Sequence, residues 1–450
     1  MSNTLDMTQG KPTKLLVKFA FPMLLTNIFQ VLYSLADSAV VGRLLGVNAF
    51  AAVGASWFYY WLLFSAILGI SHGFGTLFAQ RFGAKDMPAL RKAFANAFLL
   101  TLGIGAALSI GGALLSRHVL TWLNTPADIM EETVIYTLLM TGGLWIAFLY
   151  NVLGSMLRGL GDSKTPLKAM IFSSLLNIAV DITLVTQTTL GVAAVVIGNL
   201  VAYAAASIYC LLKLRRIQEA RLTRADFAWD KASVTALLRL GLPLGFRNFV
   251  TSLGGLAVQY AINGYGTVFV AGVTASRRLN DLLWMIGGAL DAAVATFTAQ
   301  NYGARALARI RQGVATGRNV MLAAAAAMLA LALVFGRGLL SLFLAGDAMQ
   351  IDAVLDVAER QLMVTALGIP VLYMLFLYRS ALQGLGDTLV PMLSGFVELG
   401  MRLVCVLLMA GFLNEWSVYL ADAVGWVAAG LLLFMAYQVL FQRRVREFGG

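Results

Sequence analysis

The sequence has few charged residues and no extended polar region. Asp, Glu, Lys and Arg make up 12% of its 450 residues, about half the share typical of soluble domains, which is roughly 25%. Mean hydropathy is +0.80. The longest polar stretch, residues 213–231, is too short to fold as a separate soluble domain. The composition excludes a globular enzyme with a membrane anchor and indicates an integral membrane protein with many helices.

Reactive side chains are also scarce. The two cysteines, Cys210 and Cys405, lie in apolar runs and suit neither a metal site nor a disulfide framework. Only two histidines are present, and no phosphate-binding loop is found: residues 154–159 have its glycine spacing, but Leu160 stands where lysine is needed. We therefore expect no catalytic residues and no cofactor, so that any transport is driven by an ion gradient or is passive.

The chain contains enough apolar sequence for twelve spans of about 20 residues each. The predicted spans are roughly 15–41, 48–78, 93–115, 127–156, 167–187, 191–212, 236–263, 270–298, 314–336, 353–382, 390–412 and 418–441. Six precede and six follow a basic linker, which predicts an N-terminal lobe (1–212), a cytoplasmic linker (213–235) and a C-terminal lobe (236–450). Six is an even number, so both lobes enter the membrane in the same direction and are related by a pseudo-two-fold axis along the membrane normal.

The net charge of +11 follows the predicted loops and does not indicate a nucleic-acid partner. Lys and Arg gather in the N-terminal segment, in alternate loops, in the linker and in the C-terminal tail, whereas the opposite loops carry little beyond Arg43, Arg117 and Arg337. Because cytoplasmic loops are enriched in Lys and Arg, we expect both termini in the cytoplasm and the lipid bilayer as the surrounding partner.

Motifs recur between the two halves. The pattern T-x-x-A-Q-x-x-G-A of residues 76–84 returns at 296–304, and G-L-G-D of 159–162 returns at 384–387. The first pair predicts a helix end followed by a short basic amphipathic helix on the lipid surface. In the second pair we expect Asp162 and Asp387 to lock turns or cap helices. A two-fold repeat in so apolar a chain is typical of a transporter built from two related bundles.

Ionisable groups inside predicted spans are functional candidates because burying charge in hydrocarbon is costly. Asp37 lies late in the first span, and Asn177 and Asp181 lie four residues apart on one face of the fifth. Their oxygens suit a proton or Na⁺ as the coupling ion, with these three residues as metal ligands if it is Na⁺. The alternative for Asp37 and Asp181 is plain solvation, for Asp181 near the outer membrane interface.

The second half offers other candidates for a cavity wall or gate. Glu398 and Arg402 are spaced as a helical ion pair that could simply neutralise itself, and Asp281 could pair locally or line a cavity. Pro22 matches Pro243 in the other half, and each allows a helix bend or is merely tolerated in the first turns of its span. Position 177 corresponds to Arg402 at the 225-residue offset, so the halves have diverged there, which favours ion coupling in one half only.

Several segments together resemble the multidrug and toxic compound extrusion (MATE) family of bacterial exporters. They are A-D-S-A-V-V-G-R-L-L-G from residue 36, the A-Q-x-x-G-A-[KR] loops, R-G-L-G-D-S-K-T-P from 158, L-N-I-A-V-D from 176 and Q-G-L-G-D-T-L-V-P from 383. The resemblance runs from about residue 15 to residue 442 and depends on the order and duplication of the motifs.

The resemblance implies an all-α membrane protein of two six-helix lobes in the bacterial cytoplasmic (inner) membrane, and we expect a monomer. It implies export of organic, often cationic amphipathic compounds in exchange for H⁺ or Na⁺. It places the coupling ion at Asp37, Asn177 and Asp181, with Asn199 as a weaker match. Some branches of the family also have acidic residues in spans 7 and 10. This chain has no clear counterpart, since span 7 offers Gln259 and span 10 has only Asp356 and Glu359 near its outer end. We expect drug and ion to compete for a negatively charged cavity in the N-terminal lobe.

Other functions stay open at this point. A flippase for lipid-linked oligosaccharides would need a more basic cavity, and the acids of the first half weigh against it. A passive channel or a membrane receptor would show no exchange driven by an ion gradient. A membrane-embedded enzyme is disfavoured by the missing catalytic groups.

Overall fold

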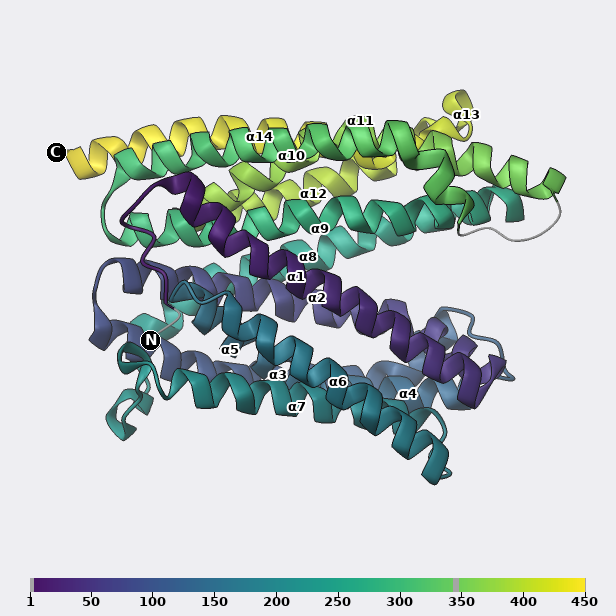
Figure 1. Cartoon of the computed structure of the whole chain (residues 1–450), viewed down its shortest axis with the longest axis horizontal. Helices are drawn as coiled ribbons and strands as arrows, with labels where there is room; N and C mark the ends of the chain where they lie inside the picture. Colours follow the sequence, from purple (N-terminus) through teal and green to yellow (C-terminus); the bar gives the residue numbers. More distant parts are fainter. Residues whose placement is uncertain (1–3, 343–347, 450) are drawn as a thin grey trace. The chain divides into compact units, whose positions relative to one another are not determined.

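The computed structural model describes residues 4–342 and 348–449, which form helices, turns and loops and contain no β-strand (Figure 1). The helices of the first half are α1 (Pro12–Val40), α2 (Val47–Gly83), α3 (Met87–Trp122), α4 (Met130–Gly142), α5 (Leu144–Gly159), α6 (Lys164–Gln187) and α7 (Val192–Leu214), with η1 (Val41–Leu45) directly after α1. Two short 3₁₀ turns, η2 (Gln218–Ala220) and η3 (Arg224–Phe227), follow. The helices of the second half are α8 (Lys231–Asn263), α9 (Thr267–Gly303), α10 (Leu307–Ser341), α11 (Ala348–Gly384), α12 (Leu389–Leu403), η4 (Val404–Leu408), α13 (Ala410–Leu413) and α14 (Trp416–Gly449).

Ten helices among the described residues are long and apolar enough to cross a membrane, and α4 with α5 forms an eleventh span bent by 41° at Gly143. The remaining long helix, α8, has 33 residues and is therefore about 50 Å long, enough to span the hydrocarbon core. Its two arginines, Arg239 and Arg247, lower its hydropathy. The all-helical membrane fold predicted from the sequence is confirmed; the bend in the fourth span was not predicted.

The chain forms two compact units, each with its own packing. One contains the residues up to Met7 and Phe21–Gly245, and the other contains Thr8–Ala20 and the residues from Phe246 onward. Helices α1 and α8 each contribute to both units, and the points where they change unit lie next to Pro22 and Pro243. The lobe boundaries at residues 212 and 236 stay a prediction about which parts of the chain move together.

α2 in the first unit and α9 in the second lie largely in the interior. The most apolar part of α2 is 67% buried and that of α9 is 61% buried, whereas the corresponding parts of α3 and α10 are 22% buried. α2 packs against α3, α4 and α5, and α9 packs against α10 and α11. α3 and α10 therefore present most of their apolar surface outward, where lipid can cover it.

Glycines allow the closest helix contact in the first unit. Gly69 and Gly73 of α2 face Gly241 and Gly245 of α8 so closely that a Cβ on Gly73 would lie 2.5 Å from the Gly241 Cα, and one on Gly69 would lie 2.7 Å from the Gly245 Cα. Both pairs have the spacing of four residues that lets membrane helices approach backbone to backbone. This contact fixes the first half of α8 to the first unit.

The repeated loops differ in part from the sequence prediction. After α2 the chain makes one tight turn in which Lys85 has a φ of 58°, and α3 begins at once with the Asp86 Oδ1 accepting from the Ala89 amide at 3.1 Å. The equivalent turn uses Arg305 at a φ of 56° before α10. The prediction of separate short surface helices is therefore wrong. Lys85 and Arg305 lie in the turns, and the basic residues after them belong to the first turns of the long helices α3 and α10, because one tight turn is enough to restart the helix.

The G-L-G-D turns form as predicted. The Asp162 Oδ1 accepts from the amides of Lys164 at 3.0 Å and Thr165 at 2.9 Å, and its Oδ2 accepts from the Thr165 hydroxyl at 2.5 Å. Asp387 likewise accepts from the Val390 amide at 3.2 Å. Gly161 and Gly386 have φ values of 81° and 84°, which only glycine adopts readily. Both aspartates thus lock a turn and start the next helix.

Candidate functional site

The polar residues predicted in the first half come together where α1, α6 and α7 meet. Asn177 and Asp181 lie one turn apart on α6 and are both fully buried, which excludes a solvated Asp181 at the membrane surface. Asp37 lies near the end of α1, and its carboxylate lies close to the side chains of Asp181 and Asn199. The π-helical turn η1 after Asp37 packs against both α6 and α7. Such turns are frequent at functional sites.

Several atoms of this cluster have no hydrogen-bond partner within the described part of the chain. They are the Asp37 Oδ1, both carboxylate oxygens of Asp181, and the amide nitrogen and oxygen of Asn177. Buried polar atoms in proteins are almost always paired, so a cluster of unpaired ones needs a ligand, an ion or water. Two neighbouring carboxylates in a low-dielectric interior in particular need a proton or a metal cation to offset their repulsion.

A glycine on the neighbouring helix shapes this cluster. A Cβ on Gly198 of α7 would overlap the Asp181 Oδ1 and would lie 3.2 Å from the Asn177 Nδ2. Gly198 therefore leaves the space that the Asp181 carboxylate occupies. The sequence analysis did not single it out, although its place directly before Asn199 is a usable signal. Asn199 itself is buried and donates to the Val195 carbonyl at 3.0 Å.

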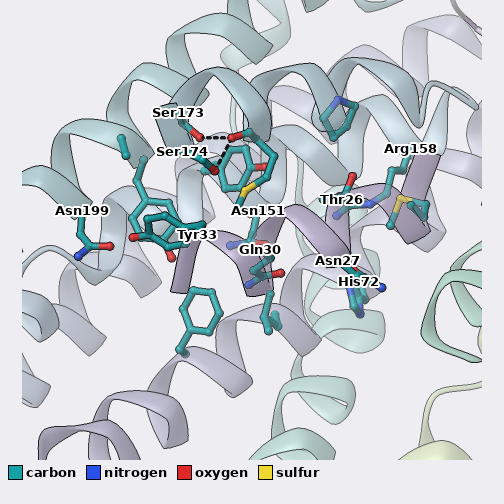
Figure 2. Close-up of a pocket in the computed structure, with 18 residues that line it drawn as sticks. Thr26, Asn27, Gln30, Tyr33, His72, Asn151, Arg158, Ser173, Ser174 and Asn199 are labelled. Carbon is teal, nitrogen blue, oxygen red and sulfur yellow. Dashed lines mark hydrogen bonds between the residues drawn. The ribbon is translucent and has the colours of Figure 1, made fainter. Parts of the chain in front are cut away.

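A cavity of about 220 Å³ lies beside the cluster (Figure 2). Tyr33 and Asn199 lie toward one side of it, and Arg158, Asn27 and His72 lie toward the other. Tyr33 and Asn199 also interact with Asp37, so they connect cavity and cluster. The volume is below the 300–1,000 Å³ of typical drug pockets, and the cavity can hold part of an organic compound.

The expectation of a negatively charged cavity is wrong for the lining of this cavity. No carboxylate is among the described lining residues, most of which are apolar, aromatic or neutral and polar, such as Gln30, Ser173 and Ser174. Arg158 is the one lining residue with a fixed charge. Its Nη2 donates to the Ser155 hydroxyl at 2.7 Å, and its position in the last turn of α5 favours a cation. The acids lie behind Tyr33 and Asn199 because α6 and α7 enclose Asp181.

The second half holds a paired charge network instead of an unpaired cluster. Glu398 is buried between Arg379, with which it forms an ion pair, and Arg402, whose Nη2 lies 3.8 Å from the Glu398 Oε2. The Arg402 Nε also lies 2.8 Å from the Asp422 Oδ1. The predicted pair of Glu398 and Arg402 is thus present and is extended by two residues that sequence spacing could not reveal.

Other charged and polar groups of the second half have their own hydrogen-bond partners. Asp291 and Arg247 were not among the candidates; Asp291 accepts from the Ser380 hydroxyl, and Arg247 donates to the Asn248 Oδ1 at 2.7 Å. Gln259 accepts from Arg277 and donates to the Asn263 Oδ1 at 2.8 Å. Asp281 is exposed and has no ion pair within the described residues.

Comparison with known proteins agrees with this arrangement. The model of the MatE family matches residues 22–183 and 243–408, one match in each half. Probable multidrug resistance protein YoeA of Bacillus subtilis (strain 168) is 27% identical over 441 residues, covering 95% of this chain and 93% of that protein. Probable multidrug resistance protein NorM of Thermotoga maritima is 24% identical, with 97% and 96% covered.

Solved structures share the fold. A MOP superfamily transporter from Pyrococcus furiosus superposes with a TM-score of 0.89 at 21% identity, with 98% of each chain covered. A MATE crystal structure in complex with MaL6 also gives 0.89, at 20% identity and with 99% and 100% covered. The two matches of the family model span most of this chain and both of its halves. The chain therefore belongs to the MATE family of multidrug efflux transporters and is not an enzyme.

Proposed function

We propose that this protein is an antiporter that exports organic, often cationic amphipathic compounds in exchange for H⁺ or Na⁺, by alternating access. The observation that carries the proposal is the cluster of unpaired buried oxygens on Asp37 and Asp181 beside a cavity. These carboxylate oxygens accept no hydrogen bond from the part of the chain that the structure describes, which suits a cation that enters and leaves. The basic residues of alternate loops support a location in the bacterial cytoplasmic membrane with both termini inside, and we expect a monomer.

In this proposal the ion and the compound interact through Tyr33 and Asn199. A cation at Asp37 and Asp181, coordinated also by the amide oxygens of Asn177 and Asn199 if it is Na⁺, changes the charge behind the cavity wall. A cationic compound then loses its electrostatic attraction to that wall and is released. Pro22 lies about two helical turns before Gln30 and about three before Tyr33. It removes one backbone hydrogen bond of α1 and allows that helix to bend as the ion binds.

The second half takes no ion in this proposal. Among the described residues, Glu398 is paired with Arg379 and Arg402, and Asp422 is paired with Arg402. Asp291 accepts a hydrogen bond from the Ser380 hydroxyl. A buried ion pair with both partners present offers no vacancy for a coupling cation. Glu398 and Arg402 then maintain the packing of α12 against α14 or act in gating, with Asp281 and Gln259 as further candidates for the substrate path.

Replacing Asp37 tests the proposal. We expect Asp37→Asn to abolish efflux of a fluorescent organic cation from cells, with normal amounts of protein in the membrane. The reason is that the neutral amide cannot accept a proton or balance the charge of Na⁺. Asp128→Asn is the matched control, since Asp128 is exposed in a loop outside the cluster, and it should leave efflux unchanged. Normal efflux by the Asp37→Asn protein would refute the assignment of the coupling site.

A further inference from the structure

A second, larger cavity lies in the second unit, between the end of α14 and the first turns of α10. Its volume is about 590 Å³. Three arginines line it, Arg311 and Arg318 from α10 and Arg446 from α14, together with Tyr378 and Tyr437. Arg311 and Arg318 are seven residues apart, which places them two turns apart on one face of the helix. The cavity thus gathers three guanidinium groups from two helices.

The positive charge of this cavity is not neutralised by the protein. No ion pair of the described residues includes Arg311, Arg318 or Arg446. Glu447 is the acid next to Arg446 in sequence, but its carboxylate lies 3.0 Å from Arg443 and 2.6 Å from Arg444. The other polar lining residues, Gln438 and Gln442, are neutral. The cavity therefore has an excess of positive charge that suits an anionic ligand.

The position of the arginines along their helices indicates the source of that anion. Residues 319–336 of α10 carry no charge, and neither do residues 423–442 of α14. Arg318 and Arg446 therefore flank the apolar segments, at the level where hydrocarbon gives way to lipid headgroups. The buried Tyr437 and its neighbour Tyr378 are aromatic residues of the kind enriched at this level.

Apolar surface next to the cavity can receive acyl chains. Val445 lines the cavity and is 45% exposed, and Val439 on the preceding turns of α14 is 66% exposed. Leu322, one turn beyond Arg318 on α10, is 41% exposed. A ligand with an anionic head and an apolar tail fits this charged surface and its apolar neighbour better than a small soluble anion does.

We propose that this cavity binds the headgroup phosphate of an anionic phospholipid. The guanidinium groups of Arg311 and Arg318 would donate to the phosphate oxygens, as planar guanidinium groups do with two parallel hydrogen bonds, and Arg446 would close the site from α14. Basic pockets between membrane helices bind anionic lipid headgroups in this way. The site is separate from the cluster at Asp37, and the proposal does not depend on the direction or coupling of transport.

Displacement of a bound fluorescent phosphatidylglycerol by unlabelled compounds tests this site. The full-length protein in detergent is incubated with the labelled lipid, which is then displaced by unlabelled phosphatidylglycerol, by phosphatidylcholine with the same acyl chains, or by glycerol 3-phosphate. We expect only phosphatidylglycerol to compete well. We also expect Arg311→Gln with Arg318→Gln to weaken binding about tenfold or more, since each arginine near a membrane surface contributes about 1 kcal/mol to anionic lipid binding.

The matched control is Arg443→Gln with Arg444→Gln, which removes two arginines from the end of α14, next to the cavity, but leaves the cavity arginines in place. It should change affinity less than twofold. Arg311→Lys with Arg318→Lys should bind more tightly than the glutamine variant and more weakly than the unaltered protein, because lysine keeps the charge but not the paired hydrogen bonds. Equal loss in the control, unchanged binding in the cavity variant or equal competition by phosphatidylcholine would overturn the proposal. Competition by glycerol 3-phosphate as strong as that by the lipid would overturn it in favour of a soluble anion.

Discussion

At the scale of single residues, Gly198 decides whether the proposed ion site can form. Its hydrogen leaves room for the Asp181 carboxylate, which a methyl group would overlap. We expect Gly198→Ala to displace Asp181, to destabilise the packing of α6 against α7 by about 1–3 kcal/mol, as overpacking of a buried site does, and to abolish coupled efflux. Efflux by cells and thermal unfolding of the purified protein measure the two effects.

Gly103→Ala is the control for that substitution, because a Cβ on Gly103 of α3 meets no atom within 4 Å. It should leave both unfolding and efflux unchanged. Should Gly198→Ala transport like the unaltered protein, the close contact between α7 and Asp181 would have no bearing on function.

Asp162 illustrates a residue whose role is structural. It accepts two backbone amides and the Thr165 hydroxyl at the start of α6. We expect Asp162→Ala to lower stability by about 0.5–2 kcal/mol, the range found for the loss of a helix cap, whereas Asp162→Asn keeps an acceptor and should lose less. Thermal unfolding in detergent compares them. An alanine variant as stable as the asparagine variant would contradict the capping role.

At the scale of helices, the contact between α2 and α8 depends on four glycines. We expect Gly73→Ala to shorten the half-life of the purified protein at elevated temperature, because its methyl group would press on the backbone at Leu240 and Gly241. Gly54→Ala in the same helix is the control, since a Cβ there meets nothing within 4 Å. Equal half-lives for the two variants would show that α8 can move away at no cost.

The sequence was sufficient to predict the membrane-spanning helices, because runs of about 20 apolar residues have few other structures available to them in a bilayer. It also predicted the partnership of Asn177 and Asp181, whose spacing of one helical turn fixes them on one face. It did not reveal the bend at Gly143 or the pairing of Glu398 with Arg379, since these depend on which helices are neighbours. The position of the acids behind Tyr33 and Asn199 was missed for the same reason.

At the scale of the whole molecule, the two halves share loops and the lengths of two helices, with 37 residues in both α2 and α9 and 36 and 35 in α3 and α10. They differ in how their buried charges are satisfied. The first half leaves carboxylate oxygens of Asp37 and Asp181 unpaired. The second half pairs Glu398 with two arginines. Among the described residues, the buried carboxylate oxygens without a hydrogen-bond partner all lie in the first half, which supports an ion-coupling role confined to that half.

Transport by the purified protein in liposomes tests this account most directly. A pH gradient and a Na⁺ gradient are imposed separately, and the movement of a fluorescent organic cation is followed for the unaltered protein and for Asp37→Asn. The account predicts movement of the cation against its own gradient with one of the two ion gradients and none with Asp37→Asn. Equal movement by both proteins, or movement that needs no ion gradient, would contradict it.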